Sequence, residues 1–443
     1  MNSFRLLPLF VAVSAALALP VGAESLVELY ESARTFDASY QSAKSQYDAT
    51  LARADQAKAA ILPTANLAVG ASRSTQEVSP EGAPTSDRSF GTENATVSAS
   101  QPLYRPGNWA SYRQGLKQVD LAQAQLSVAD QDLIVRVSQA YFDVLASQDS
   151  LTFVQAQKTA VGEQLASAKR NFEVGTSTIT DTREAQARYD LVIAQEIAAE
   201  NDLRVKRIAL DQLVGKNNAQ PQPLAQPLAL PALMPDDVNV WVQQSEAEHP
   251  GIKQTQVALD VAQLETQKAQ AGHKPTLDLV ASYSAINNVN GSSSSVGSSR
   301  VNTGAIGLSF NLPLFAGFST QNRIRETLAL EEKARNDLDG AKRSVAQGTR
   351  TAYFGVLSGQ GQVKALEAAE ASSQSALDAN KLGYQVGVRI NIDVLNSQSQ
   401  LFDTKARLAK ARYDVLVGGL RLRQASGTLK AEDLQSVNGL LAK

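Results

Sequence analysis

The sequence predicts a mainly α-helical protein with a membrane-type β-domain, built from one structural unit written twice. Three patterns predict this fold class. Short motifs of the first half recur at one constant spacing in the second, and each half contains two segments in which apolar and small polar residues alternate. Each half also contains a very long helical tract, and in the first half this tract is proline-free over about 65 residues and has a heptad pattern, which indicates long helices packed side by side.

The composition excludes several kinds of functional site. The chain has 443 residues, 42 Lys and Arg against 44 Asp and Glu, no Cys and two His. Disulfides and thiolate metal sites are therefore excluded, and His249 and His273 lack an acidic cluster that could complete a metal site. The near-neutral charge lacks the basic surplus of a nucleic-acid-binding protein. We expect no metal, no cofactor and no nucleic-acid partner.

Residues 1–23 have the features of a secretory signal peptide. Arg5 precedes an apolar run from Leu6 to Leu19, and small residues follow as far as Ala23. The alternative is a membrane anchor, but about 14 apolar residues are too few to cross a bilayer. We expect cleavage after Ala23 and export of the mature chain.

The internal repeat divides the mature chain into two units. The motif Ala140-Tyr141-Phe142 recurs as Ala352-Tyr353-Phe354, and Phe172-x-Val174-Gly175 recurs at the same offset as Tyr384-x-Val386-Gly387. The stretch between the units is rich in proline and predicts an extended linker. The predicted organisation is a first unit, a linker, a second unit and a tail, over 24–215, 216–236, 237–427 and 428–443.

Each unit is predicted to contain a helix, two strands, a very long helix and a final helix. In the first unit these are expected over 25–60, 62–78, 90–104, 105–172 and 178–214. The strands of the second unit are expected over 275–289 and 300–315. The first and last helices together nearly equal the long one in length, so we expect them to lie end to end beside it.

Four strands from one chain cannot close a barrel. An open sheet leaves two unpaired edges, which lipid does not tolerate. Two chains would supply eight strands and a filled interior, whereas three would supply twelve and leave room for a lumen. The helices would then form a tube that continues from one end of the barrel. The alternative from pattern alone is a soluble coiled-coil protein with small β-hairpin heads.

Over essentially its full length the chain resembles the TolC family of outer-membrane channel proteins. The stretches that carry the resemblance are Ala140 to Leu145, Lys274 to Leu279, Gly307 to Pro313, Tyr384 to Arg389 with Asp393-Val394-Leu395, and Gly427-Thr428-Leu429. The resemblance implies a homotrimer whose twelve-stranded β-barrel lies in the outer membrane. It also implies a long α-helical coiled-coil barrel that crosses the periplasm.

The same resemblance implies a gate at the periplasmic tip, which opens by untwisting of the helix pairs. Carried over by position, the gate links Tyr384 and Arg389 of the second unit to Thr180 and Asp181 of the first. The chemistry is suitable because a guanidinium and a phenol can both donate to a carboxylate. The alternative is that Asp181 caps the adjacent helix and that Arg389 is a solvated turn residue.

The resemblance also places Asp393 at the pore constriction, where a trimer would form a ring of three carboxylates. Such a ring attracts cations. Many relatives carry a second Asp one turn later, but this chain has Asn396 there. We therefore expect weaker block by multivalent cations than in a channel with two acidic rings.

The function implied by the resemblance is a passive exit duct for small molecules, for secreted proteins, or for both. A periplasmic adaptor protein would dock at the tips, around Val174-Gly175 and Val386-Gly387, and connect the duct to an inner-membrane transporter of the ABC, RND or MFS type. The chain has no phosphate-binding loop, so the partner must supply the energy. An enzyme is disfavoured because the two histidines fit surface positions, and an adhesin or a general porin is disfavoured by the repeat and the high helix content.

Overall fold

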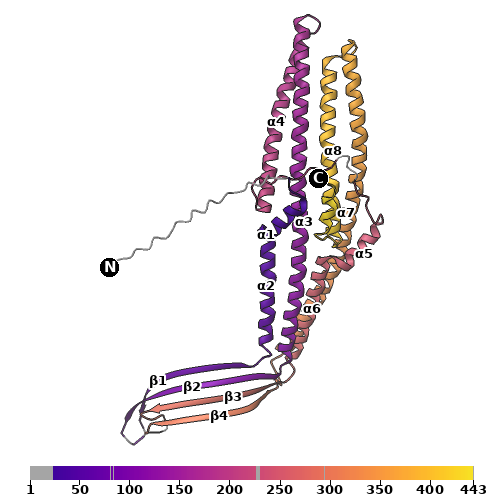
Figure 1. Ribbon diagram of the computed structural model, residues 1–443. Helices are drawn as coiled ribbons and strands as arrows, with labels where there is room; N and C mark the ends of the chain where they lie inside the picture. The colour runs from indigo at the N-terminus through magenta and orange to yellow at the C-terminus, as the bar shows by residue number, and fades with distance from the viewer. Residues whose placement is uncertain (1–22, 80, 83, 226–229, 294, 443) are drawn as a thin grey trace, which may run out of the picture.

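The computed structural model describes residues 23–79, 81–82, 84–225, 230–293 and 295–442. The predicted signal peptide therefore lies outside the described residues, except for Ala23. Long helices form an extended bundle, and a four-stranded sheet projects sideways from one end of it (Figure 1). In the described part of the chain, every helix falls short of the combined length and apolar character that a bilayer span requires.

The two halves of the chain contain the same elements in the same order. The first half contains α1, α2, β1, β2, α3 and α4, over Leu26–Phe36, Ala38–Ala59, Thr64–Val78, Ser86–Tyr104, Pro106–Glu173 and Ile179–Val214. The second half contains α5, α6, β3, β4, α7 and α8, over Val238–Glu248, Pro250–Ala271, Thr276–Val289, Ser299–Asn311, Ser319–Gln385 and Asn391–Ala425. A short helix, α9 (Asp433–Asn438), follows near the C-terminus.

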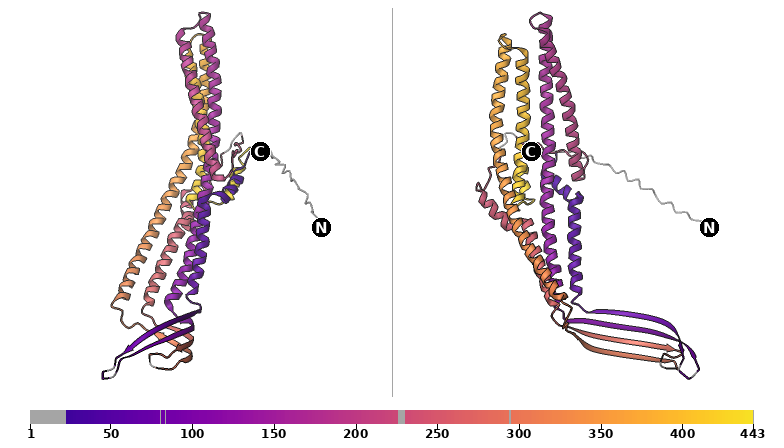
Figure 2. Two further views of the ribbon diagram at one scale, coloured as in Figure 1. Left: turned by 90° about the vertical axis from the view of Figure 1, so that its left-hand side faces the viewer. Right: turned by 180° about the vertical axis from the view of Figure 1, so that it is seen from behind.

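The long helices set the length of the molecule. α3 has 68 residues and α7 has 67, so each is about 100 Å long at 1.5 Å per residue. α2 and α4 lie one above the other along α3, and α6 and α8 lie in the same way along α7 (Figures 1 and 2). α3 also packs against α6 and α8, and this contact joins the two repeats.

The single helix expected over 25–60 is instead two helices, because the chain turns at Asp37. The Asp37 carboxylate accepts a hydrogen bond from the Tyr40 amide at 2.8 Å and pairs with Arg136 of α3 at 2.9 Å. His249, at the equivalent position of the second repeat, divides α5 from α6. Its Nδ1 accepts from the Gly251 amide at 3.0 Å, and Pro250 begins α6. In both repeats one residue therefore ends the first helix through its backbone N–H and caps the start of the second with its side chain.

The sheet is antiparallel in the order β1-β2-β3-β4, so the pairing of β2 with β3 joins the two repeats. β4 ends at Asn311 rather than at 315, and Pro313 follows without an N–H that could continue the ladder. Where the sheet meets the bundle, the Arg105 guanidinium holds the Asp278 carboxylate of β3 with two hydrogen bonds, at 2.8 and 2.5 Å. This bidentate pair fixes the start of α3 against the sheet.

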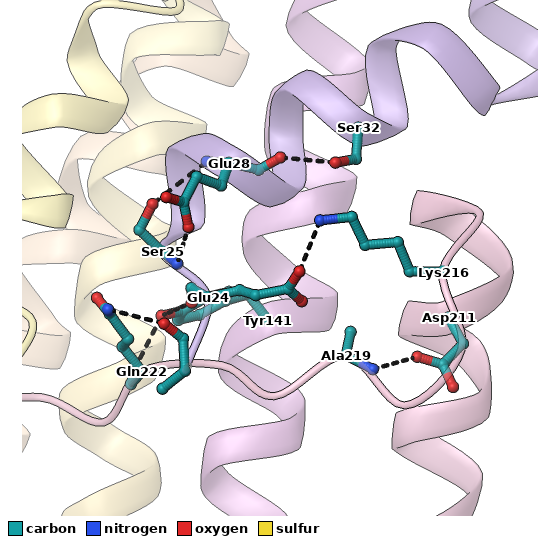
Figure 3. Close-up of polar contacts among 10 residues, drawn as sticks. Glu24, Ser25, Glu28, Ser32, Tyr141, Asp211, Lys216, Ala219 and Gln222 are labelled. Carbon is teal, nitrogen blue, oxygen red and sulfur yellow. Dashed lines mark hydrogen bonds and ion pairs between the residues drawn. The ribbon is translucent and has the colours of Figure 1, made fainter. Parts of the chain in front are cut away.

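The linker begins beside the N-terminal end of the described chain, midway along the bundle (Figures 1 and 3). The Glu24 amide donates to the Gln220 carbonyl at 2.7 Å, and the Glu24 carboxylate pairs with Lys216 at 2.6 Å. Tyr141 of α3, which is fully buried, donates to the Gln222 carbonyl at 2.9 Å. Burial raises the pKa of the Tyr141 phenol, so this side chain stays a neutral donor that holds the linker against the helices.

Candidate functional site at the helical tips

The two hairpin turns, α3–α4 and α7–α8, lie near each other at the end of the bundle farthest from the sheet (Figures 1 and 2). In each turn an exposed valine precedes a glycine: Val174 precedes Gly175 with φ +75°, and Val386 precedes Gly387 with φ +79°. Glycine adopts this left-handed conformation without strain and ends the long helix. A Cβ on either glycine would meet no atom within 4 Å, so both turns present open surface in the single chain.

Asp181 lies in the first turn of α4 and completes a capping box with Thr178. The Asp181 amide donates to the Thr178 hydroxyl at 3.2 Å, and the Asp181 carboxylate accepts from the Thr178 amide at 3.0 Å. The same carboxylate accepts from the Ser177 hydroxyl at 2.7 Å. Partial burial acts to raise the pKa of Asp181, but the hydrogen bonds from Ser177 and Thr178 outweigh it and hold the pKa below its ordinary value. The capping role weighed for Asp181 is thus present, with Thr178 as the N-cap residue.

Replacing Asp181 with alanine is expected to loosen the start of α4 by about 1 kcal/mol, the usual worth of such a cap. Because the pKa is lowered, the ionised carboxylate stabilises the folded turn. Its contribution is complete above the ordinary pKa of about 4 and is lost as the pH falls through the lowered value. Hydrogen exchange at pH 7 should therefore quicken about fivefold at the amides of residues 178 and 181, whose hydrogen bonds make up the capping box. Arg183→Ala, at an exposed position on the next part of the same helix, is the control and should leave the rate unchanged.

Asp393 is the equivalent of Asp181 in the second repeat, but its surroundings differ. The N-cap residue of α8 is Ile390, which has no hydroxyl, and no side-chain cap forms. The Asp393 carboxylate instead lies 3.7 Å from the Arg389 guanidinium, one helical turn earlier. It is about one third exposed. Two residue differences, Arg389 in place of Ser177 and Ile390 in place of Thr178, leave Asp393 without the cap that holds Asp181.

The single chain does not bring the four predicted gate residues together. Tyr384 accepts a hydrogen bond from the Asn171 side chain at 3.4 Å, across the gap between the two hairpins. Arg389, in the turn that precedes α8, pairs with Asp393 in the first turn of that helix. Thr180 is exposed. Within the described chain, Tyr384 and Arg389 make these contacts rather than the predicted contacts to Thr180 and Asp181, so the gate stays a prediction.

Asn396, the uncharged substitute for a second acidic ring, has an arginine partner that sequence reasoning missed. The Arg188 guanidinium of α4 donates to the Asn396 side-chain carbonyl at 2.8 Å. The two residues belong to different repeats, so only the fold brings them together. Each chain therefore adds a positive charge one helical turn from Asp393.

Asn391, at the first position of α8, was also missed. It is completely buried. Its side-chain oxygen accepts a hydrogen bond from Gln164 of α3, and its side-chain nitrogen donates to the Asp181 backbone carbonyl at 3.4 Å. A polar residue among the apolar positions near a helix start was the available signal, but the sequence did not show its partners.

His249 and His273 both lie outside the helical tips. His249 caps α6, and burial lowers the pKa of its imidazole. His273 lies in the turn that follows α6. Across the ranges that the structure describes, no group of three or more His, Cys, Asp or Glu side chains is placed to hold a metal ion.

Comparison with known proteins decides the family. A family model described as outer membrane efflux protein matches the chain twice, over residues 29–216 and 241–428. The chain belongs to the outer membrane efflux protein family. The second match is displaced from the first by the same offset at both ends, and this offset is the one that separates the repeated motifs.

Individual relatives agree with this assignment. The outer membrane protein TolC of Vibrio cholerae is 33% identical over 435 residues, which cover 98% of each chain. The alkaline protease secretion protein AprF of Pseudomonas aeruginosa is 31% identical over 417 residues, which cover 93% of this chain and 86% of AprF. The predicted resemblance to the TolC family is therefore confirmed, and the protein is an outer-membrane channel protein.

The fold agrees with solved structures of such channels. The CmeC outer membrane channel of Campylobacter jejuni superposes with a TM-score of 0.79 at 15% sequence identity, covering 95% of this chain and 90% of that chain. The predicted fold class, a duplicated helical channel protein with a membrane β-domain, is confirmed by this likeness and by the family match.

Proposed function

We propose that three copies of this chain form a passive exit duct through the outer membrane and the periplasm. The observation that carries the proposal is the open sheet. β1 and β4 are its two edges, and every residue of β4 is exposed in the single chain. An edge strand of 13 residues is not stable in lipid without a partner. Pairing of β4 with β1 of the next copy removes both edges, and three copies close a barrel of twelve strands with room for a lumen.

The two faces of the sheet suit lipid outside and water inside. The pairing register places apolar side chains on one face: Leu67, Val69, Val97, Leu279, Tyr283, Ile306, Leu308 and Phe310. All of them are exposed in the single chain. On the other face lie small polar residues, and the Thr96 hydroxyl donates to the Ser284 hydroxyl across the strands at 3.1 Å. This alternation is typical of barrels that carry a wet lumen.

The exposed hairpin turns at the tips support a periplasmic adaptor protein and an inner-membrane transporter as the partners. The hairpin turns at Val174-Gly175 and Val386-Gly387 are open and lie opposite the membrane domain, where a periplasmic adaptor protein can bind them. The adaptor links the duct to an inner-membrane transporter of the ABC, RND or MFS type, which supplies the energy. AprF is named for secretion of a protease, and the family model for efflux, so the cargo class includes proteins, small molecules or both. The chain itself carries out no catalytic step.

The number of copies is the first test of the duct. Native mass spectrometry of the detergent-extracted protein should give three chains per particle. Replacing Ile306 with lysine places a charge on the lipid face of β4 and should reduce the yield of inserted trimer, whereas Gly307→Ser on the opposite face should not. A predominant dimer, or a soluble particle that needs no detergent, would contradict the proposal.

A further inference from the structure

Each hairpin at the tip is tied together internally by strong polar contacts. Within α3–α4, Lys158 pairs with Glu196 at 2.6 Å. Within α7–α8, the Asn380 side chain donates to the Ser397 hydroxyl at 2.5 Å. Each hairpin is thus a tightly packed pair, and the seam between α8 and the α3–α4 hairpin is the boundary between the two pairs.

An apolar cluster forms the centre of this seam near the tip. Leu395 of α8 is fully buried among Val161, Leu165, Ala185 and Val192, and Ile392 packs against the same cluster. The hydrophobic effect that holds such a cluster together is non-directional. A buried hydrogen bond adds a geometric requirement that apolar contact alone does not supply.

Asn391 is the completely buried polar contact in this seam. Three other hydrogen bonds join the hairpins near the tip (Asn171 to Tyr384, Arg188 to Asn396 and Gln157 to Ser399), and each includes a side chain that is partly or fully exposed. The buried amide of Asn391 joins three helices, because it accepts from Gln164 of α3 and donates to the carbonyl of Asp181 in α4. The capping box holds the first turn of α4, and so holds that carbonyl in place. A buried amide that loses its partners is left unsatisfied, and a single buried Asn is known to fix register between packed helices.

We propose that Asn391 is a positioning residue that pins α8 to the α3–α4 hairpin and holds the tips in the resting arrangement. The inference rests on the proposed function, since it concerns how the duct stays closed. Opening requires α7–α8 to move away from α3–α4, and the Gln164–Asn391–Asp181 bridge has to break before the apolar seam can shift. Three chains place three such bridges at the tip. A partner that opens the duct must break all of them.

The first test replaces Asn391 with leucine, which keeps the volume and removes both hydrogen bonds. In planar bilayers containing the purified full-length channel, the frequency of open events should rise on the order of tenfold over wild type. The matched control is Ser399→Ala, which removes the 3.3 Å bond to Gln157 on the same seam, about 12 Å farther from the tip. It should stay within about twofold of wild type. The proposed role of Asn391 is contradicted if the Asn391→Leu channel opens like wild type, or if the Ser399→Ala channel opens as often as Asn391→Leu.

A second test distinguishes loss of the specific amide contact from simple loss of packing. Exchanging the two amides, Gln164→Asn with Asn391→Gln, keeps the total length of the pair and should restore closure relative to Asn391→Gln alone. Failure of the exchange to restore closure, with the trimer intact, argues against a specific amide contact.

A third test uses the absence of cysteine from the chain. In the Gln164→Cys, Asn391→Cys double variant, a short cleavable thiol crosslinker should hold the channel closed, and cleavage of the linker should release it. Crosslinked channels that open normally would mean that α8 and α3 move together, which overturns the inference. If the wild-type protein itself forms no channel in the bilayer, the result contradicts the proposed function and not the role of Asn391.

Discussion

Replacing Asp393 with alanine should weaken the block of the channel by a multivalent cation at least about tenfold. In the proposed trimer, with Asp393 at the predicted constriction, three carboxylates would surround the pore axis and would attract a trivalent ion together. Even with the dielectric of water, three charges acting on such an ion over a few ångströms exceed the roughly 1.4 kcal/mol that corresponds to tenfold. The measurement is single-channel current in a planar bilayer, titrated with a trivalent metal–ammine complex.

A second variant should change the block in the opposite direction. It replaces Arg188, whose guanidinium donates to the Asn396 side chain at 2.8 Å. This positive charge would lie about one helical turn from the predicted acidic ring and would oppose cation binding, so Arg188→Gln should strengthen the block a few-fold. Block that persists unchanged in Asp393→Ala would remove Asp393 from the constriction. Block unaffected by Arg188→Gln would show that this guanidinium lies outside the field of the ring.

Replacing Arg389 with alanine is expected to raise the resting conductance severalfold. In the single chain this guanidinium pairs with Asp393 at 3.7 Å and is otherwise well exposed, so it is available to a neighbouring copy. In the predicted gate, a charge-assisted bond to Asp181 of that copy would contribute about 1.5–3 kcal/mol per link, and three such links would act together at the tip. The measurement is conductance at a fixed voltage, with growth on an antibiotic too large for ordinary porins as the cellular counterpart.

The matched control for the gate is Arg183→Ala, which removes an exposed arginine from α4 without touching a predicted link. It should leave the conductance unchanged. If Arg389→Ala also leaves the conductance unchanged, Arg389 is only a solvated turn residue, and the gate then depends on other contacts.

The order of elements was predictable from the sequence, because it depends on local and periodic signals. Heptads and the absence of proline predicted the long helices, alternation predicted the strands, and the constant spacing of the motifs predicted that the second unit repeats the first. The break at Asp37 was missed, since an aspartate can occupy a helix interior and only its bonds to Tyr40 and Arg136 show that it is a cap.

The tip was less predictable, because its contacts join residues that are far apart in the chain. Val174, Gly175, Val386 and Gly387 were identified from the repeated motif itself. Arg188 and Gln164 were missed, since their partners, Asn396 and Asn391, lie in the other repeat. Links between copies are one step further removed, as no single chain contains both sides of them.

The most direct test of the exit duct is export from a strain that lacks this chain. Such a strain should accumulate a fluorescent efflux substrate, become hypersensitive to drugs or fail to secrete a large polypeptide. A β-lactamase substrate should enter the periplasm at the wild-type rate, which shows that the outer membrane is intact. Restoring the wild-type chain should restore export, and loss of the inner-membrane transporter should reproduce the defect. Normal export in the deletion strain, with a change only in outer-membrane leakiness that no transporter affects, would instead identify a general porin.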